Sequence, residues 1–218
     1  MTHVLTYSLL QATTLPTATA LPAWWSTWAL PIGAGICLAA ATGFRTFVPL
    51  LAVALASRFG LFALDGQYAW LVSTAAVIAL ATAAVLEVGA YYIPVVDNAL
   101  DLVATPLSMV AGTLVMFTSI GSDHGLPGWL LATIVGGGLS GMVQLSTVKA
   151  RALSTGTTAG LANPVLATGE LIGSLLLSGL ALFVPVIAAV LAVVVVFVLW
   201  RTIRWLRRPR ARALQPVG

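Results

Sequence analysis

The sequence predicts an all-α fold: a polytopic transmembrane helix bundle of about six spans, with one or two interrupted helices and cytoplasmic N- and C-termini. Three observations predict it: the composition, a series of long apolar segments and a basic C-terminal end. Of the 218 residues, 60% are hydrophobic and 7% are charged, whereas soluble domains carry roughly a quarter charged residues. The mean hydropathy is +1.04. The spans leave no room for a soluble catalytic domain, so no enzyme activity is expected.

The chain is expected to divide into three parts. Residues 1–23 form an N-terminal tail without Lys or Arg, so a cleaved secretory signal is not expected. Residues 24–200 form the transmembrane domain, which opens with a cluster of tryptophans that is typical of an interfacial anchor. Residues 201–218 form a basic cytoplasmic tail that contains six arginines.

Apolar runs and helix-breaking residues set the expected spans. The first is interrupted between Gly43 and Pro49, and the second ends in an aromatic belt at Tyr91 and Tyr92. The fifth starts at Asn163 as N-cap, with Pro164 at the first helical position. The expected spans are 31–57, 68–92, 97–119, 129–148, 163–183 and 185–200.

Basic residues predict the orientation and the environment. Positive charge stays on the cytoplasmic side, which places the C-terminal tail inside, and Lys149 and Arg151 after the fourth span fall on the same side. We therefore expect a multi-pass protein of the cell membrane, in contact with anionic lipids and able to form a homo-oligomer. Nucleic acid binding is not expected, because no aromatic residues alternate with the basic run.

Four carboxylates lie in or at the edge of the apolar segments. Ionisable groups at membrane depth are costly and usually mark an ion, proton or substrate path. For Glu87 the alternative is an interfacial carboxylate bonded to a tyrosine, and for Glu170 it is a structural ion pair. The four carboxylates are Glu87, Asp97, Asp101 and Glu170.

The third segment carries a polar stripe. Helical spacing places its polar and small residues on one face, where oxygen atoms can replace the water around a cation or proton. The alternative is capping, with Asp97 at the helix start and Asp101 in its first turn. Hydroxyl residues are also common in packing between membrane helices. The stripe consists of Asp97, Asp101, Thr105, Ser108 and Gly112.

Three basic residues are candidate counter-charges for this path. Arg45 lies near the middle of the first span, and Lys149 and Arg151 lie at the end of the fourth. An arginine at membrane depth needs a carboxylate, carbonyl groups or water. Asn163 joins the expected path because it stands at a helix start.

Two segments have the pattern of broken helices. Residues 42–49 and 158–164 both run from Thr through Gly to Pro. Interrupted segments point to transporter binding sites, because helix ends expose backbone dipoles to an ion. The two segments also suggest an internal duplication. A second similarity, between residues 94–101 and 164–170, pairs the spans differently, so an inverted repeat is not established.

Other site chemistries are poorly supported. His3, His124 and Cys37 are far apart, which argues against a transition-metal site and a disulfide framework. The segment 138–141 fits a G-x-S-G string of intramembrane serine proteases, but no histidine lies in a facing span. The sequence predicts no cofactor and does not identify a metal ion.

The ordered motifs resemble a bacterial multipass membrane family named domain of unknown function 4126, over most of residues 32–182. Phe44 stands where that family more usually has an aliphatic residue, and Glu170 stands alone where an acidic pair is expected. The resemblance implies the architecture and the choice of site residues, and it implies no activity. It rests on residues 43–50, Glu87, residues 93–101, residues 148–151, residues 160–165 and Glu170.

The leading functional hypothesis is a small secondary transporter or permease for an inorganic ion or small polar solute. The intramembrane carboxylates would coordinate or titrate, and Arg45 would be the counter-charge. The alternative is a non-transporting scaffold or assembly component whose ion pairs fix helix register. A third hypothesis is lipid handling, with Arg45 and the basic tail binding lipid phosphate.

Overall fold

The computed structural model describes residues 28–64, 66–121 and 125–184, and individual residues at 187, 188, 190, 191, 194, 197, 201 and 204. All regular structure in these residues is helical, which confirms the predicted all-α class. The predicted tails, residues 1–23 and most of residues 201–218, lie outside the described residues. The helices are α2 (Leu30–Phe44), α3 (Phe47–Arg58), η2 (Gly66–Val72), α4 (Thr74–Ala90), α5 (Pro94–Ile120), α6 (Gly125–Leu131), η4 (Ala132–Gly137), α7 (Gly138–Thr158) and α8 (Asn163–Phe183).

The helices that are long and apolar enough to span a membrane lie in the later part of the chain. Ala99–Ile120, Gly125–Thr158 and Asn163–Phe183 are each long and apolar enough to cross a membrane. The pair η2 and α4 would form a fourth span, bent by 61°. The structure therefore supports three spans, or four with the bent pair, among the described residues.

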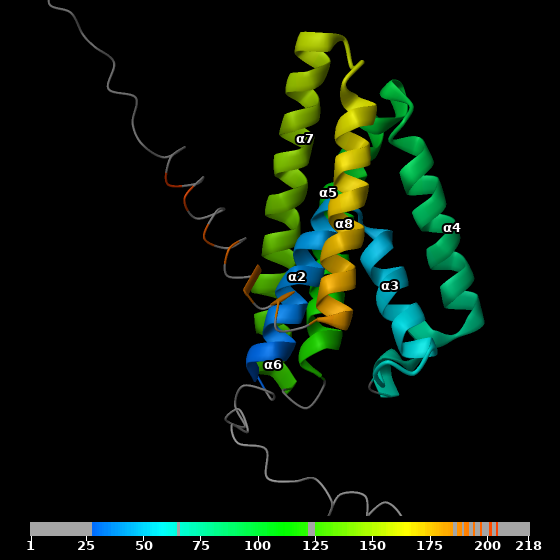
Figure 1. The fold of residues 1–218 in the computed structure, drawn as a ribbon, viewed down its shortest axis with the longest axis vertical. Helices are drawn as coiled ribbons and strands as arrows, with labels where there is room; N and C mark the ends of the chain where they lie inside the picture. Colours follow the sequence, from blue (N-terminus) through cyan, green and yellow to red (C-terminus); the bar gives the residue numbers. More distant parts are fainter. Residues whose placement is uncertain are drawn as a thin grey trace, which may run out of the picture.

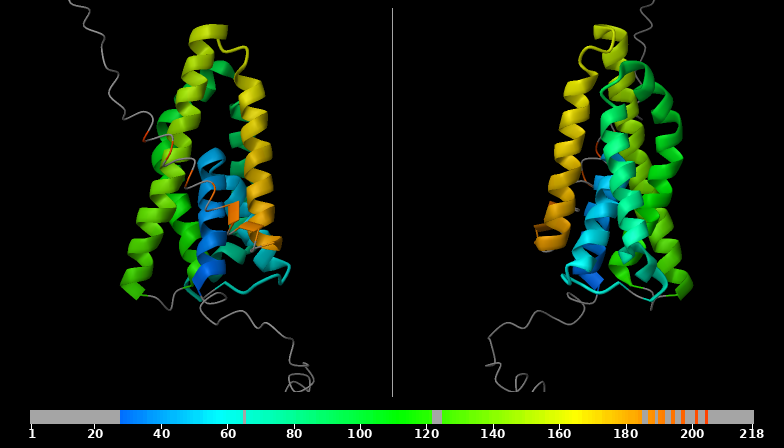
Figure 2. Two further views of the ribbon diagram at one scale, coloured as in Figure 1. Left: turned by 60° about the vertical axis from the view of Figure 1, so that its left-hand side comes forward. Right: turned by 90° about the vertical axis from the view of Figure 1, so that its right-hand side faces the viewer.

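The first predicted span is a hairpin of two short helices. Figures 1 and 2 show α2 rising from one end of the bundle to about its middle, and α3 returning to the same end. The predicted interruption is confirmed at Arg45, but the stretch 31–57 does not cross the bundle as one helix. At the base of α3, Arg58 Nη1 donates to the carbonyl of Val72 at 3.0 Å.

Helix α2 occupies the centre of the bundle and packs against α5, α7 and α8, whereas α4 lies at the periphery against α3 (Figure 1). The core around α2 contains Cys37, Leu38, Val53 and Val115, all nearly inaccessible to solvent. Small residues let the helices approach closely. A Cβ atom on Gly43 would lie 2.6 Å from the carbonyl oxygen of Ser140, so α2 can meet α7 here because position 43 is glycine.

The end of α7 differs from the prediction. The fourth span was expected to end near residue 148, but the helix continues to Thr158. Arg151 consequently lies inside the bundle, 1% exposed, and is no longer a marker of the cytoplasmic side. The second predicted broken helix, 158–164, is the turn between α7 and α8, with positive φ at Ala159 and Gly160.

The start of α8 is confirmed at Asn163 with proline in its first turn, but the N-cap is Ala162. The side chain of Asn163 makes no capping hydrogen bond and instead reaches a carboxylate of another helix. The segment therefore begins as the sequence predicts, while its asparagine has a different partner.

The hairpin can be tested by substituted-cysteine labelling in sealed vesicles with a membrane-impermeant maleimide. Trp28, before α2, and Leu61, after α3, are 45% and 53% exposed, and Leu161, between α7 and α8, is 83% exposed. Trp28→Cys and Leu61→Cys should label from the same side, and Leu161→Cys from the opposite side. Native Cys37 is fully buried and gives little background. Labelling of Trp28→Cys and Leu61→Cys from opposite sides would restore the single-span interpretation.

Candidate functional site

Arg45 lies at the tip of the hairpin because the backbone changes conformation there. Its φ of −143° and ψ of 116° are extended, which ends α2 and separates it from α3. Pro49 lies in the first turn of α3, where a missing amide hydrogen costs little. The break places the arginine side chain, 0% exposed, inside the bundle.

Arg45 contacts α8 and the end of α4. Its Nη2 donates to the carbonyl of Ala167 at 2.7 Å and lies 3.6 Å from Oε2 of Glu170. The guanidinium carbon lies 4.3 Å from the ring centroid of Tyr91, a cation–π distance. The buried charge is therefore balanced by a carboxylate, a carbonyl and an aromatic face.

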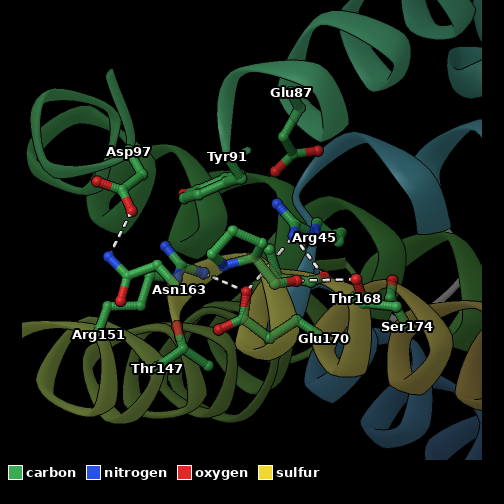
Figure 3. A network of polar contacts seen from close by, with 12 residues as sticks. Arg45, Glu87, Tyr91, Asp97, Thr147, Arg151, Asn163, Thr168, Glu170 and Ser174 are labelled. Carbon is green, nitrogen blue, oxygen red and sulfur yellow. Dashed lines mark hydrogen bonds and ion pairs between the residues drawn. The ribbon is translucent and has the colours of Figure 1, made fainter. Parts of the chain in front are cut away.

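Arg151, on α7, connects α5 to the same region and makes a second contact with α8. Its Nη1 donates to Oδ1 of Asp101 on α5. Its Nη2 donates to Oε2 of Glu170 on α8 (Figure 3). Its guanidinium carbon lies 4.0 Å from the centroid of the Tyr91 ring, and the Tyr91 hydroxyl donates to Oδ1 of Asp101 at 3.2 Å. We name Arg45, Tyr91, Asp101, Arg151 and Glu170 the ion-pair cluster.

Glu87 binds backbone rather than an arginine side chain. Its Oε1 accepts from the amide of Thr46 at 2.7 Å, and its Oε2 accepts from the amide of Phe47 at 3.1 Å. These amides open α3, where unsatisfied N–H groups and the helix dipole favour a negative charge. Glu87 thus anchors α4 to the hairpin tip next to Arg45 (Figure 3).

Asp97 and Asn163 form a polar contact between α5 and α8. Asn163 Nδ2 donates to Oδ2 of Asp97 at 2.8 Å and to Oγ1 of Thr155 at 3.1 Å. Asp97 is fully buried and Asn163 is 1% exposed. Asp97 lies in the first turn of its helix as the capping alternative requires, but its helix is capped by Ile93 and its described side-chain partner is Asn163.

Three predicted site residues form no side-chain hydrogen bond or ion pair with the buried charged side chains around the hairpin tip in the described structure: Thr105, Ser108 and Lys149. The hydroxyls of Thr105 and Ser108 donate to carbonyls within their own helix, at 3.2 and 2.9 Å. The carbonyl of Ser108 accepts from Ser140 of α7 at 2.8 Å, so this part of the stripe contributes to helix packing. Lys149 is exposed and forms no salt bridge with a described residue.

Several buried polar atoms around the cluster find no hydrogen-bond partner among the described residues. Buried polar groups in folded proteins nearly always have a partner, so unpartnered donors and acceptors in one region are available to a bound ion, water or solute. No three His, Cys, Asp or Glu side chains in the described part of the chain are placed to hold a metal ion. The unpartnered atoms are Arg45 Nε and Nη1, Thr46 Oγ1, Asp97 Oδ1, Arg151 Nε and Asn163 Oδ1.

The sequence interpretation missed Tyr91. The pair Tyr91 and Tyr92 was expected to form an aromatic belt, but Tyr91 is 2% exposed and only Tyr92 is exposed, at 42%. A spacing of four residues from Glu87 on the same helix was the available signal, because such residues share a helix face. Thr155, which binds Asn163, gave no signal beyond its place in a polar run.

Removing the central arginine tests whether the cluster supports the fold. Arg151→Gln should leave Asp101 and Glu170 buried without their shared partner and lower the free energy of unfolding by about 3–5 kcal/mol. Arg151→Lys should recover only part of this loss, because an ammonium cannot reproduce the planar donor geometry. Thermal unfolding in detergent provides the measurement, with exposed Lys149→Gln as control. Equal unfolding temperatures for Arg151→Gln and Lys149→Gln would show that the cluster does not stabilise the bundle.

Comparison with known proteins identifies the family and leaves its activity open. No curated protein and no solved structure matches the chain significantly. The family model described as Domain of unknown function (DUF4126) matches residues 32–205. This range contains the hairpin except its first two residues, every member of the ion-pair cluster and the Asp97–Asn163 contact. The chain belongs to the DUF4126 family, as the motifs in its sequence predict.

Proposed function

We propose that this protein is a small secondary transporter or permease for an ion or small solute, with the ion-pair cluster as its binding and coupling site. The observation that carries the proposal is a set of buried charges at the broken helix, accompanied by unpartnered polar atoms. Ionisable groups among apolar helices are costly and are typical of ion, proton or substrate paths.

The charge balance favours a cation or a proton. Around the hairpin tip, Glu87, Asp97, Asp101 and Glu170 are buried together with Arg45 and Arg151. With all six ionised, this region of the described structure has a formal net charge of −2. A buried charge in a medium of low dielectric constant favours binding of an opposite charge, so added positive charge is the expected ligand.

The hairpin supports the same proposal. The backbone of α2 ends and that of α3 begins inside the bundle, and broken helices of this kind direct backbone dipoles towards substrates in transporters. In the described conformation, Glu87 occupies the amide end of α3, at Thr46 and Phe47. Protonation of this carboxylate would weaken those two bonds and free the hairpin tip.

We further propose a multi-pass protein of the cell membrane with the basic tail in the cytoplasm. Because the first predicted span is a hairpin that does not cross the bundle, the expected positions of the two ends of the chain change. Figures 1 and 2 place the start of α2 and the end of α8 at the same end of the bundle. A further span over 185–200 would then place the cytoplasmic tail on the side opposite to the start of α2, in contrast to the predicted arrangement with both termini inside.

The scaffold alternative has one observation in its favour. Asp101 and Glu170 bind Arg151, Glu87 binds the amides of α3, and Asp97 binds Asn163. A set of charges in which each carboxylate has a protein partner can fix helix register without moving a substrate. Lipid handling through Arg45 is less well supported, because this side chain is fully buried.

Flux measurements with the purified protein in liposomes distinguish these functions. With a pH-sensitive dye inside, an imposed proton or potassium gradient should produce flux in the wild type. Asp101→Asn and Glu170→Gln should each reduce the flux about tenfold or more, since each removes a buried charge from the cluster. Lys149→Gln should transport normally.

Thermal unfolding of the same samples supplies the control for folding. Folded variants with reduced flux support a transport site. Absence of flux in the wild type, with variants that differ only in stability, would contradict transport and favour the scaffold.

A further inference from the structure

A cavity of about 570 Å³ lies between α2, α7 and α8, and Val194, beyond the end of α8, also lines it. Small-molecule sites in proteins occupy roughly 300–1,000 Å³, so this space is large enough for a ligand. Its walls are almost entirely apolar and include Phe44, Val143, Leu166 and Leu177. Glu170 is the only charged residue among the described residues that line it.

The cavity arises from the arrangement of α7 and α8. These helices are joined at one end and separate along their length, and both pack mainly against other helices rather than each other (Figure 2). Ser146, Ala150 and Gly169 line the cavity and are exposed on the outside of the bundle. The cavity is therefore open towards the surface that would face lipid.

Glu170 connects this cavity to the ion-pair cluster. Its Oε2 binds Arg151 and lies 3.6 Å from Nη2 of Arg45. No described residue donates a hydrogen bond to its Oε1, and the residue is 8% exposed. One carboxylate oxygen is thus held by the arginines, while the other has no described donor and belongs to a side chain that lines an apolar space.

We propose that this cavity binds a lipophilic monovalent cation, with its apolar body between α7 and α8 and its charge near Glu170. This inference rests on the proposed transport function and names its substrate class. Apolar walls disfavour a hydrated inorganic ion, because they offer few oxygen atoms to replace its water. Glu170, the only charged side chain among the described lining residues, favours a cation over an anion of the same shape.

Equilibrium binding of tetraphenylphosphonium to the full-length protein in detergent tests the proposal. Tetraphenylborate has nearly the same shape and the opposite charge, and protein-free micelles correct for partitioning. We expect saturable binding of the cation and no saturable binding of the anion. Glu170→Gln should weaken binding of the cation about tenfold or more, as expected for loss of one charge pair.

A second variant blocks the cavity without changing a charge. A Cβ atom on Gly169 would meet no atom within 4 Å, so Gly169→Phe can place its ring in the space. Gly179 on the same helix is equally open and does not line the cavity, which makes Gly179→Phe the matched control. Gly169→Phe should abolish binding, whereas Gly179→Phe should bind like the wild type at similar thermal stability.

The outcomes separate this inference from the proposed function. Equal binding of both probes, or unchanged binding in Gly169→Phe, overturns the cation site. If proton or potassium flux depends on Glu170 while tetraphenylphosphonium does not bind, transport stands and the substrate class is wrong. If the cation binds as expected and no substrate is transported, including tetraphenylphosphonium itself, the site stands and the transport function fails.

Discussion

The bridge from Arg151 to Asp101 and Glu170 is the interaction on which the polar interior depends. It joins α5, α7 and α8 at one guanidinium group, which is the shared counter-charge of both buried carboxylates. Glu170 then extends the bridge to Arg45 at the hairpin tip. A single planar side chain thereby connects three long helices next to the broken helix.

Tyr91 allows the two buried arginines to lie close to each other. Arg45 and Arg151 repel each other, yet both guanidinium groups lie over its ring, at 4.3 and 4.0 Å from the centroid. The ring offers negative electron density to both, and its hydroxyl fixes Asp101 beside them. Glu87, one helical turn earlier, holds the start of α3. The end of α4 thus organises the site although the rest of this helix is peripheral.

Much of the helical content and the identity of the central residues could be predicted from the sequence. Apolar length, Pro164 and the isolated charges Arg45 and Glu170 were sufficient signals, since buried charges need partners and long apolar runs need helices. The partner of each charge could not be predicted. Composition does not distinguish Lys149 from Arg151. Their different positions around the α7 helix leave Lys149 exposed and bury Arg151 inside the bundle.

The hairpin escaped prediction for a related reason. The mostly apolar run of 27 residues, 31–57, has the length of a span, and its hydropathy does not record that the chain reverses at Arg45. The reversal depends on tertiary contacts, namely the capping of α3 by Glu87 and the packing of α2 among three helices. Local sequence signals therefore located the break in the helix without revealing that the chain turns back there.

The depth of the hairpin tip also has an electrical consequence. The transmembrane potential acts on a charge in proportion to the part of the field that it crosses, at about 2.3 kcal/mol per elementary charge per 100 mV for the full distance. Because α2 ends and α3 begins near the middle of the bundle, a cation that reaches Glu170 from one surface would cross only part of that field (Figure 1). Membrane voltage would then bias occupancy of the site as well as net movement across it.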